Sequence, residues 1–136
     1  MLKTDIKIIQ LPKIFDPRGN LTFLQYPDQI PFEIKRVFWI YDVPGGEYRG
    51  GHANKSLYEL IIAISGSFDI VIKDKNGKEQ KFCLNRSYFG LYLPPITWRH
   101  MENFSTNSVS VHVCSAAFDE SDYIRDFEEF KKVHHE

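Results

Sequence analysis

Residues 45–66 read GGEYRGGHANKSLYELIIAISG, and this stretch decides the fold. A glycine-rich bend opens it, and the apolar run Leu60 to Ile64 follows before a closing glycine. Short apolar runs bounded by glycine are typical of buried β-strands. His52, Asn54 and Glu59 therefore stand at the entrance to a core strand. If the chain around His52 is extended, His52 and Asn54 point to the same face.

The rest of the chain contains further strand-like segments. They alternate apolar and polar residues or are rich in β-branched and aromatic residues. These segments are residues 6–11, 21–25, 35–42, 67–73, 79–84, 87–93, 98–104 and 108–116. Asn76-Gly77, between two of them, predicts a two-residue hairpin turn with positive φ at both positions. The pattern predicts an all-β sandwich or barrel of about nine or ten strands.

Only the end of the chain has a different period. After Asp119, apolar side chains recur at intervals of three and four residues among charged ones, which predicts a short amphipathic helix. These side chains are Tyr123, Ile124, Phe127 and Phe130. Asp119 or Ser121 is suited to be its N-cap.

Length and charge limit the possible functions. A chain of 136 residues predicts a single domain spanning residues 1–136. Its 17 basic and 18 acidic residues give a net charge of −1, so we expect no nucleic-acid or anionic-membrane partner. Apolar stretches are too short to span a membrane, and residues 1–10 lack the apolar region of a secretory signal. We therefore expect a cytoplasmic protein.

A second polar cluster is GLYLPPITWRHMEN, residues 90–103. It resembles the second signature of the cupin superfamily, and residues 46–66 resemble the first. In metal-binding cupins the resemblance would place ligands at His52, Asn54, Glu59 and His100. An amide oxygen is a weak ligand for Fe, Mn or Zn, so Asn54 favours a pocket without a metal or other cofactor.

Four runs extend the resemblance to nearly the whole chain: residues 30–43, 49–57, 90–101 and 118–132. They resemble the nucleotide-sugar 3,4-ketoisomerases, small cupins that act on TDP-4-oxo-6-deoxyglucose. The resemblance implies a cupin jelly-roll barrel, a homodimer, and a role in deoxysugar biosynthesis for surface polysaccharides. His52 matches the first histidine of that family's HxH pair, but Asn54 replaces the second.

That reaction moves a carbonyl from C4 to C3 of the sugar and passes through an enediolate. His52 is our candidate base, because a neutral imidazole is available at pH 7. Arginines suit the enediolate and the diphosphate, since guanidinium groups bind anions bidentately. The predicted catalytic residues are His52, Asn54, Arg18, Arg99 and His100. The predicted substrate-binding residues are Arg36, Arg49, Phe38, Tyr41, Glu59 and Tyr92.

Two other functions remain open. The run Arg49-Gly-Gly-His52-Ala-Asn54 also resembles the TDP-sugar 3,5-epimerases, which are longer enzymes. Asn54 would also suit a non-catalytic module that binds sugar nucleotides. For any of the three we expect a homodimer, because residues 2–11 are suited to add a strand to a partner's sheet.

Overall fold

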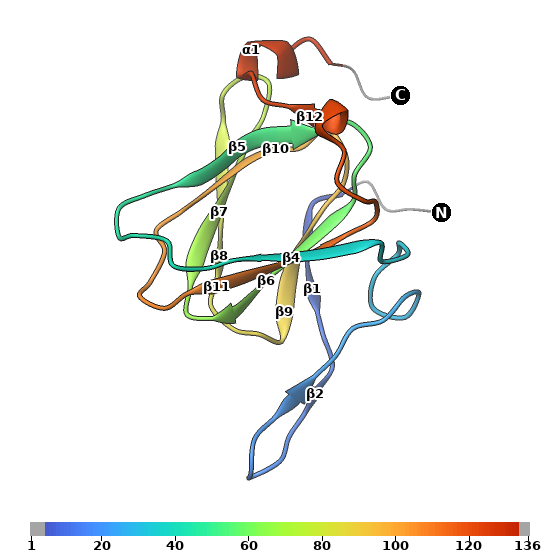
Figure 1. The fold of residues 1–136 in the computed structure, drawn as a ribbon, viewed down its shortest axis with the longest axis vertical. Coiled ribbons are helices and arrows are strands. Elements are labelled where there is room, and N and C mark those ends of the chain that lie inside the picture. The colour runs from blue at the N-terminus through green and yellow to red at the C-terminus, as the bar shows by residue number, and fades with distance from the viewer. Residues whose placement is uncertain (1–4, 134–136) are drawn as a thin grey trace.

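The computed structural model describes residues 5–133, which form two facing five-stranded sheets and a small two-stranded one (Figure 1). The first sheet has the order β1 (Lys7–Gln10), β9 (Phe89–Leu93), β6 (Glu59–Ser65), β11 (Val109–Cys114), β4 (Arg36–Ile40). The second has the order β12 (Tyr123–Ile124), β5 (Arg49–Asn54), β10 (Trp98–Glu102), β7 (Phe68–Lys73), β8 (Glu79–Leu84). Neighbouring strands are antiparallel, which confirms the predicted all-β, jelly-roll type of fold.

The space between the sheets is filled because side chains alternate along each strand. On β6, Ile61 and Ala63 point inward and pack with Phe68 and Ile70 of β7 and Leu91 of β9. Leu60 and Ile62 alternate with these residues and face outward, where they belong to a second hydrophobic cluster. That cluster also contains Leu11, Ile30, Phe32, Tyr92 and Val113.

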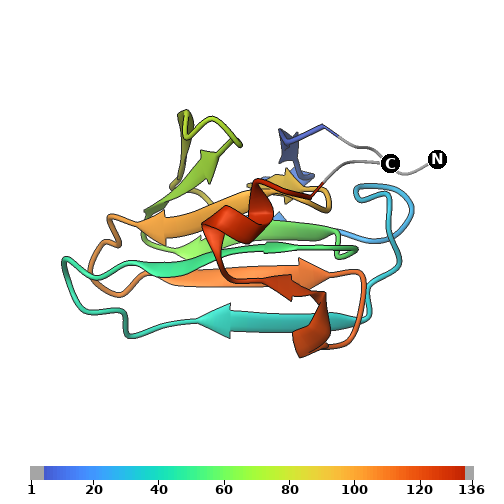
Figure 2. The same cartoon turned by 90° about the horizontal axis from the view of Figure 1, so that it is seen from above.

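A hairpin of β2 (Lys13–Ile14) and β3 (Leu21–Thr22) projects from the barrel at the end opposite to α1 (Figure 1). Seen from above, the C-terminal segment crosses the other end and places β12 beside β5 (Figure 2). No helix within residues 5–133 is long and apolar enough to cross a membrane.

The predicted short C-terminal helix is present but begins later than expected. Only Phe127–Phe130 form an α-helix, α1, after a 3₁₀ turn η1 (Glu120–Asp122) and the strand β12. Asp119 caps the 3₁₀ turn and Asp126 caps α1, so each carboxylate starts a separate short turn. The described chain has twelve strands, more than the nine or ten predicted, and these include the two-residue strands β2 and β12, which lie outside the predicted segments.

The hairpin after β7 also differs from the prediction. Lys73 pairs with Glu79, so five residues rather than two connect the strands. Gly77 has a φ of +85°, whereas Asn76 is not among the residues with positive φ. The Asp74 carboxylate accepts hydrogen bonds from the backbone N–H groups of Asn76 and Lys78, which favours the longer loop.

Candidate active site

A cavity of about 200 Å³ lies between the two sheets where β5 meets β10 and β12. Inward-facing side chains of six strands line it because alternate residues of each strand point into the barrel. The polar members of this lining are Arg49, His52, Glu59, Arg99, His100, His112, Tyr123 and Arg125. Residues far apart in the chain are thus brought to one small space, as active-site clefts require.

His52 lies on β5 and has one defined tautomer. Its Nδ1 is bonded to the Gly50 carbonyl oxygen, which only accepts, so the hydrogen is on Nδ1. The Nε2 atom therefore carries the lone pair. Burial and then the nearby positive charge of Arg99 lower the pKa of His52 to about 3, although Glu59 opposes the shift. His52 is consequently a neutral imidazole at physiological pH, able to accept a proton at Nε2.

Glu59 is the centre of a buried network. One carboxylate oxygen accepts a hydrogen bond from Arg99, and the other accepts one from Nδ1 of His112 at 2.6 Å. Nε2 of His112 then accepts from the Ser110 hydroxyl at 2.9 Å. The His112 ring also stacks on Phe38, with centroids 4.3 Å apart. These bonds fix Arg99 and His112 at the wall of the cavity.

Glu59 stays ionised although it is buried, because Arg99 and His112 are its hydrogen-bond partners. Burial alone would raise the pKa of Glu59, but Arg99 and His112 outweigh it and lower the pKa to about 2. A guanidinium and a carboxylate are therefore buried as a compensated pair, with Arg99 and Glu59 each 4% exposed. Glu59, predicted to bind substrate, directs both oxygens to protein partners.

Asn54 shares the strand with His52 but lines an adjoining cavity of about 360 Å³. Its amide nitrogen donates to Asp122 at 3.3 Å, whereas its oxygen has no hydrogen-bond partner among the described residues. Arg36 lines the same cavity, and its Nε is also unpaired within residues 5–133. Asn54 is 1% exposed, so an acceptor and a donor without hydrogen-bond partners in the described chain are buried at this cavity.

The other predicted site residues divide into two groups. Arg49, His100 and Phe38 line the His52 cavity together with Arg99. Nε2 of His100 is bonded to Glu102 at 2.7 Å.

Three predicted residues line neither the His52 cavity nor the Asn54 cavity. Arg18 lies on the loop of the β2–β3 hairpin, exposed and paired with Asp16 at 2.8 Å. Tyr41 is exposed on the outer side of the first sheet, after β4. Tyr92 is fully buried beside Phe32, and burial raises its pKa to about 12. Its ring therefore has no open face for a ligand, and Tyr92, a predicted substrate-binding residue, lies in the packed core instead.

Sequence reasoning missed two residues that line the cavity, Tyr123 and Arg125. Both were assigned to a continuous helix, where they would lie apart from His52. His112 also lines the cavity, and its place between Val111 and Val113 leaves open, from the sequence, which face of the sheet it takes. No pattern in the sequence indicates that Glu59 binds His112, because the two are far apart in the chain.

Among residues 5–133 there is no group of three His, Cys, Asp or Glu side chains arranged to hold a metal ion. Glu59 is bonded to Arg99 and His112, and His100 to Glu102, so these side chains have other partners. The absence of a metal requirement stays a prediction.

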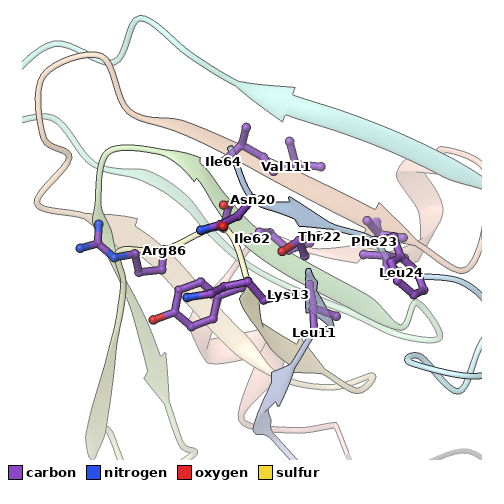
Figure 3. Close-up of a pocket in the computed structure, with 13 residues that line it drawn as sticks. Leu11, Lys13, Asn20, Thr22, Phe23, Leu24, Ile62, Ile64, Arg86 and Val111 are labelled. Atoms are coloured by element: carbon purple, nitrogen blue, oxygen red, sulfur yellow. The ribbon is translucent and has the colours of Figure 1, made fainter. Parts of the chain in front are cut away.

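A larger cavity of about 710 Å³ lies between the β2–β3 hairpin and the outer face of the first sheet (Figure 3). Lys13 and Arg86 lie on one side of it, and Ile64 and Val111 on the other. No histidine or carboxylate lines it within the described chain. We therefore assign the acid–base chemistry to the smaller cavity.

Comparison with known proteins decides the family. The family model described as "FdtA: WxcM-like, C-terminal" matches residues 4–135. The chain belongs to this family. It is 40% identical over 126 residues to the TDP-4-oxo-6-deoxy-α-D-glucose-3,4-oxoisomerase of Aneurinibacillus thermoaerophilus, covering 93% of this chain and 90% of that one.

Solved structures of this FdtA/WxcM-like family have the same fold. A 3,4-ketoisomerase from Helicobacter canadensis matches with a TM-score of 0.90 and 37% identity, covering 96% of this chain and 97% of that one. QdtA, a sugar 3,4-ketoisomerase from Thermoanaerobacterium thermosaccharolyticum in complex with TDP, matches with a TM-score of 0.90 and 35% identity, covering 93% and 91%. A 4-keto-6-deoxy sugar epimerase from Streptomyces spheroides is 16% identical, with a TM-score of 0.74, and shares the fold alone.

Proposed function

We propose that this member of the FdtA/WxcM-like family is a nucleotide-sugar 3,4-ketoisomerase that acts on a TDP-4-oxo-6-deoxy-hexose, in deoxysugar biosynthesis. The observation that carries the proposal is His52: a neutral imidazole, with its tautomer fixed by Gly50, opens its Nε2 to a small cavity beside Arg99. The named relatives at 35–40% identity support it, since they act on or bind compounds of this class. The epimerase alternative has only distant structural support.

The reaction uses groups that face the cavity. His52 takes the proton from C3, the electrons of that bond form a C3–C4 double bond, and the former carbonyl oxygen on C4 gains negative charge. Arg99 lies close enough to His52 to lower its pKa, so its charge also favours an anion formed there. The proton of the C3 hydroxyl passes to the oxygen on C4, a proton returns to C4, and the carbonyl re-forms at C3.

The diphosphate needs local positive charge, because the whole chain carries a net charge of −1. Arg49 lines the His52 cavity and is exposed, which suits a group that meets the diphosphate, and Arg36 lines the adjoining cavity. Calorimetry of TDP binding tests this assignment. Arg49→Ala should weaken binding by about 2–3 kcal/mol, as for a lost bond to a charged group, and an unchanged dissociation constant would remove Arg49 from the site.

NMR of the product tests the function. Purified protein is incubated with TDP-4-oxo-6-deoxyglucose, and we expect the carbonyl to move to C3. Inversion at C3 and C5 with the carbonyl still at C4 would show an epimerase instead. An unchanged sugar together with measurable TDP binding would show a non-catalytic module.

The same proposal includes a cytoplasmic homodimer. The outer face of the first sheet and the β2–β3 hairpin carry large exposed apolar side chains, which commonly mark an interface. These are Ile14, Phe15, Leu21, Phe23, Val37, Trp39, Tyr41 and Ile64. In the single chain β1 pairs with β9 of its own sheet and is an edge strand, while the first residues of the predicted pairing segment, 2–4, lie outside the described chain.

A further inference from the structure

Two cavities meet at one side chain, Tyr123. Within residues 5–133, the cavities around His52 and around Asn54 share no other lining residue. Tyr123 reaches this position because β12 pairs with β5 and sets it directly opposite Asn54. Its ring centroid lies 4.9 Å from that of His52. A phenol is therefore held beside the candidate base.

The neighbouring polar groups are poor proton donors. Both oxygens of Glu59 and both nitrogens of His112 are bonded within the protein. Nε2 of His100 is bonded to Glu102, a neighbour on the same strand. Amides and guanidinium groups do not release protons near neutral pH, which excludes Asn54 and the arginines as acids.

Two arginines lie around Tyr123. Arg36 lines the Asn54 cavity together with Tyr123. Arg125 lines the His52 cavity, and its Cζ lies 4.3 Å from the Tyr123 ring centroid. A cationic side chain is therefore present in each of the two cavities that Tyr123 lines.

We propose that Tyr123 is a catalytic residue that moves the oxygen-bound proton of the reaction, while His52 moves the carbon-bound one. The inference rests on the proposed function and deepens it. When His52 removes the C3 proton, Tyr123 donates its hydroxyl proton to the oxygen on C4, giving an enediol. The phenolate then takes the proton of the C3 hydroxyl, the C3 carbonyl forms, and C4 receives the proton from His52. Both side chains end in their starting states.

Isomerisation in D₂O tests whether Tyr123 and His52 move different protons. NMR follows two rates with TDP-4-oxo-6-deoxyglucose: formation of the 3-oxo sugar, and loss of the C3–H signal from the remaining substrate. Tyr123→Phe keeps the ring against His52 but removes the hydroxyl. Product formation should fall by about 10²-fold or more, the usual effect of a positioned acid or base. Exchange at C3 should fall much less, because the enediolate then returns to substrate.

The ratio of the C3 exchange rate to the product formation rate distinguishes a catalytic role of the Tyr123 hydroxyl from a purely structural one. It should rise at least tenfold in Tyr123→Phe and stay at the wild-type value in Tyr26→Phe, a control on an exposed tyrosine outside both cavities. Near-normal product formation by Tyr123→Phe, or an equal fall in both rates, would overturn the inference. If the wild-type protein forms no 3-oxo sugar, the proposed function itself fails and the inference with it.

Discussion

His52 and Glu59 face the same cavity and carry pKa shifts of different origin. His52 has its pKa lowered by burial and by Arg99, and it stays neutral. Glu59 is also buried, but Arg99 and His112 keep it charged. One basic group is therefore kept free for a ligand, while the acidic group is used to hold its neighbours in place.

Replacing Glu59 by Gln tests the buried network. The change leaves the Arg99 charge buried without its partner, and breaking a buried ion pair in this way costs about 3–5 kcal/mol. Urea unfolding should show that loss. Glu33→Gln is the control, because the Glu33–Lys35 pair is exposed and should contribute about 0–1 kcal/mol. Equal effects of the two substitutions would contradict the assigned role of Glu59.

The low pKa of His52 predicts how stability depends on pH. Below pH 6.5 the unfolded chain binds a proton at His52 that the folded protein excludes down to about pH 3, so the free energy of unfolding falls across this range. The depressed pKa of Glu59 adds a further loss only below pH 4.5, as the pH approaches 2. Between pH 7 and pH 5 the loss should therefore be smaller in His52→Asn than in wild type. Urea unfolding at both pH values measures this loss of unfolding free energy. Equal losses in His52→Asn and wild type would refute the lowered pKa of His52.

For single residues, the sequence indicates which side chains belong to the site better than it indicates which side chains bond to one another. The glycine-framed motif predicted that His52, Arg99 and His100 meet, and the structure brings them to one cavity. The partners of Glu59 depend on the pairing of β6 with β11, which places His112 opposite Ile61. Such a register is set by packing across the sheet, and the sequence does not reveal it.

The C-terminal segment is the element whose structure departs most from its sequence pattern. The spacing of Tyr123, Ile124 and Phe127 fits a helix, but Asp122 bonds to β5 and the chain continues as a strand. Its carboxylate accepts from the Ser56 backbone N–H at 2.9 Å, and its carbonyl accepts from Lys55 N–H at 2.8 Å. These tertiary bonds override a local helical preference.

Asp122→Ala should loosen this element without unfolding the barrel. The substitution removes the carboxylate bonds to Ser56 and Asn54. We expect local opening to become easier by about 2 kcal/mol, and hence exchange of the Ser56 amide to become about 30-fold faster. Turnover should fall too, because Tyr123 is less firmly held. Hydrogen exchange measures the effect, with the Val71 amide of β7 as internal control; an unchanged Ser56 rate would show that other contacts hold β12.

On the scale of the whole molecule, strand periodicity predicted most of the barrel. Glu79–Leu84 agrees residue by residue, and the ends of β4, β9, β10 and β11 differ from the predicted segments by at most two residues. β3 is shorter than the predicted segment 21–25, and no predicted segment covers β2, because each of these strands has only two residues. Strands that short leave no alternating pattern to detect.

The proposed homodimer gives a prediction on mass. Sedimentation at micromolar concentration should show two copies of the 16.0 kDa chain. Trp39→Glu places a charge on the exposed apolar face of the first sheet, where Trp39 is 60% exposed, and should give monomers. Tyr48→Glu, at a residue 68% exposed that contacts His100 instead, should remain dimeric. A wild-type particle of one chain, or a dimeric Trp39→Glu variant, would argue against this interface.

The proposed reaction depends most directly on His52 as the base that removes the C3 proton. His52→Asn removes the imidazole whose Nε2 carries the lone pair, and kcat for conversion of TDP-4-oxo-6-deoxyglucose to the 3-oxo sugar should fall by about 10²–10⁴-fold. Circular dichroism and urea unfolding would establish that the variant is folded. Near-normal turnover in folded His52→Asn protein would contradict the central claim and require a different base.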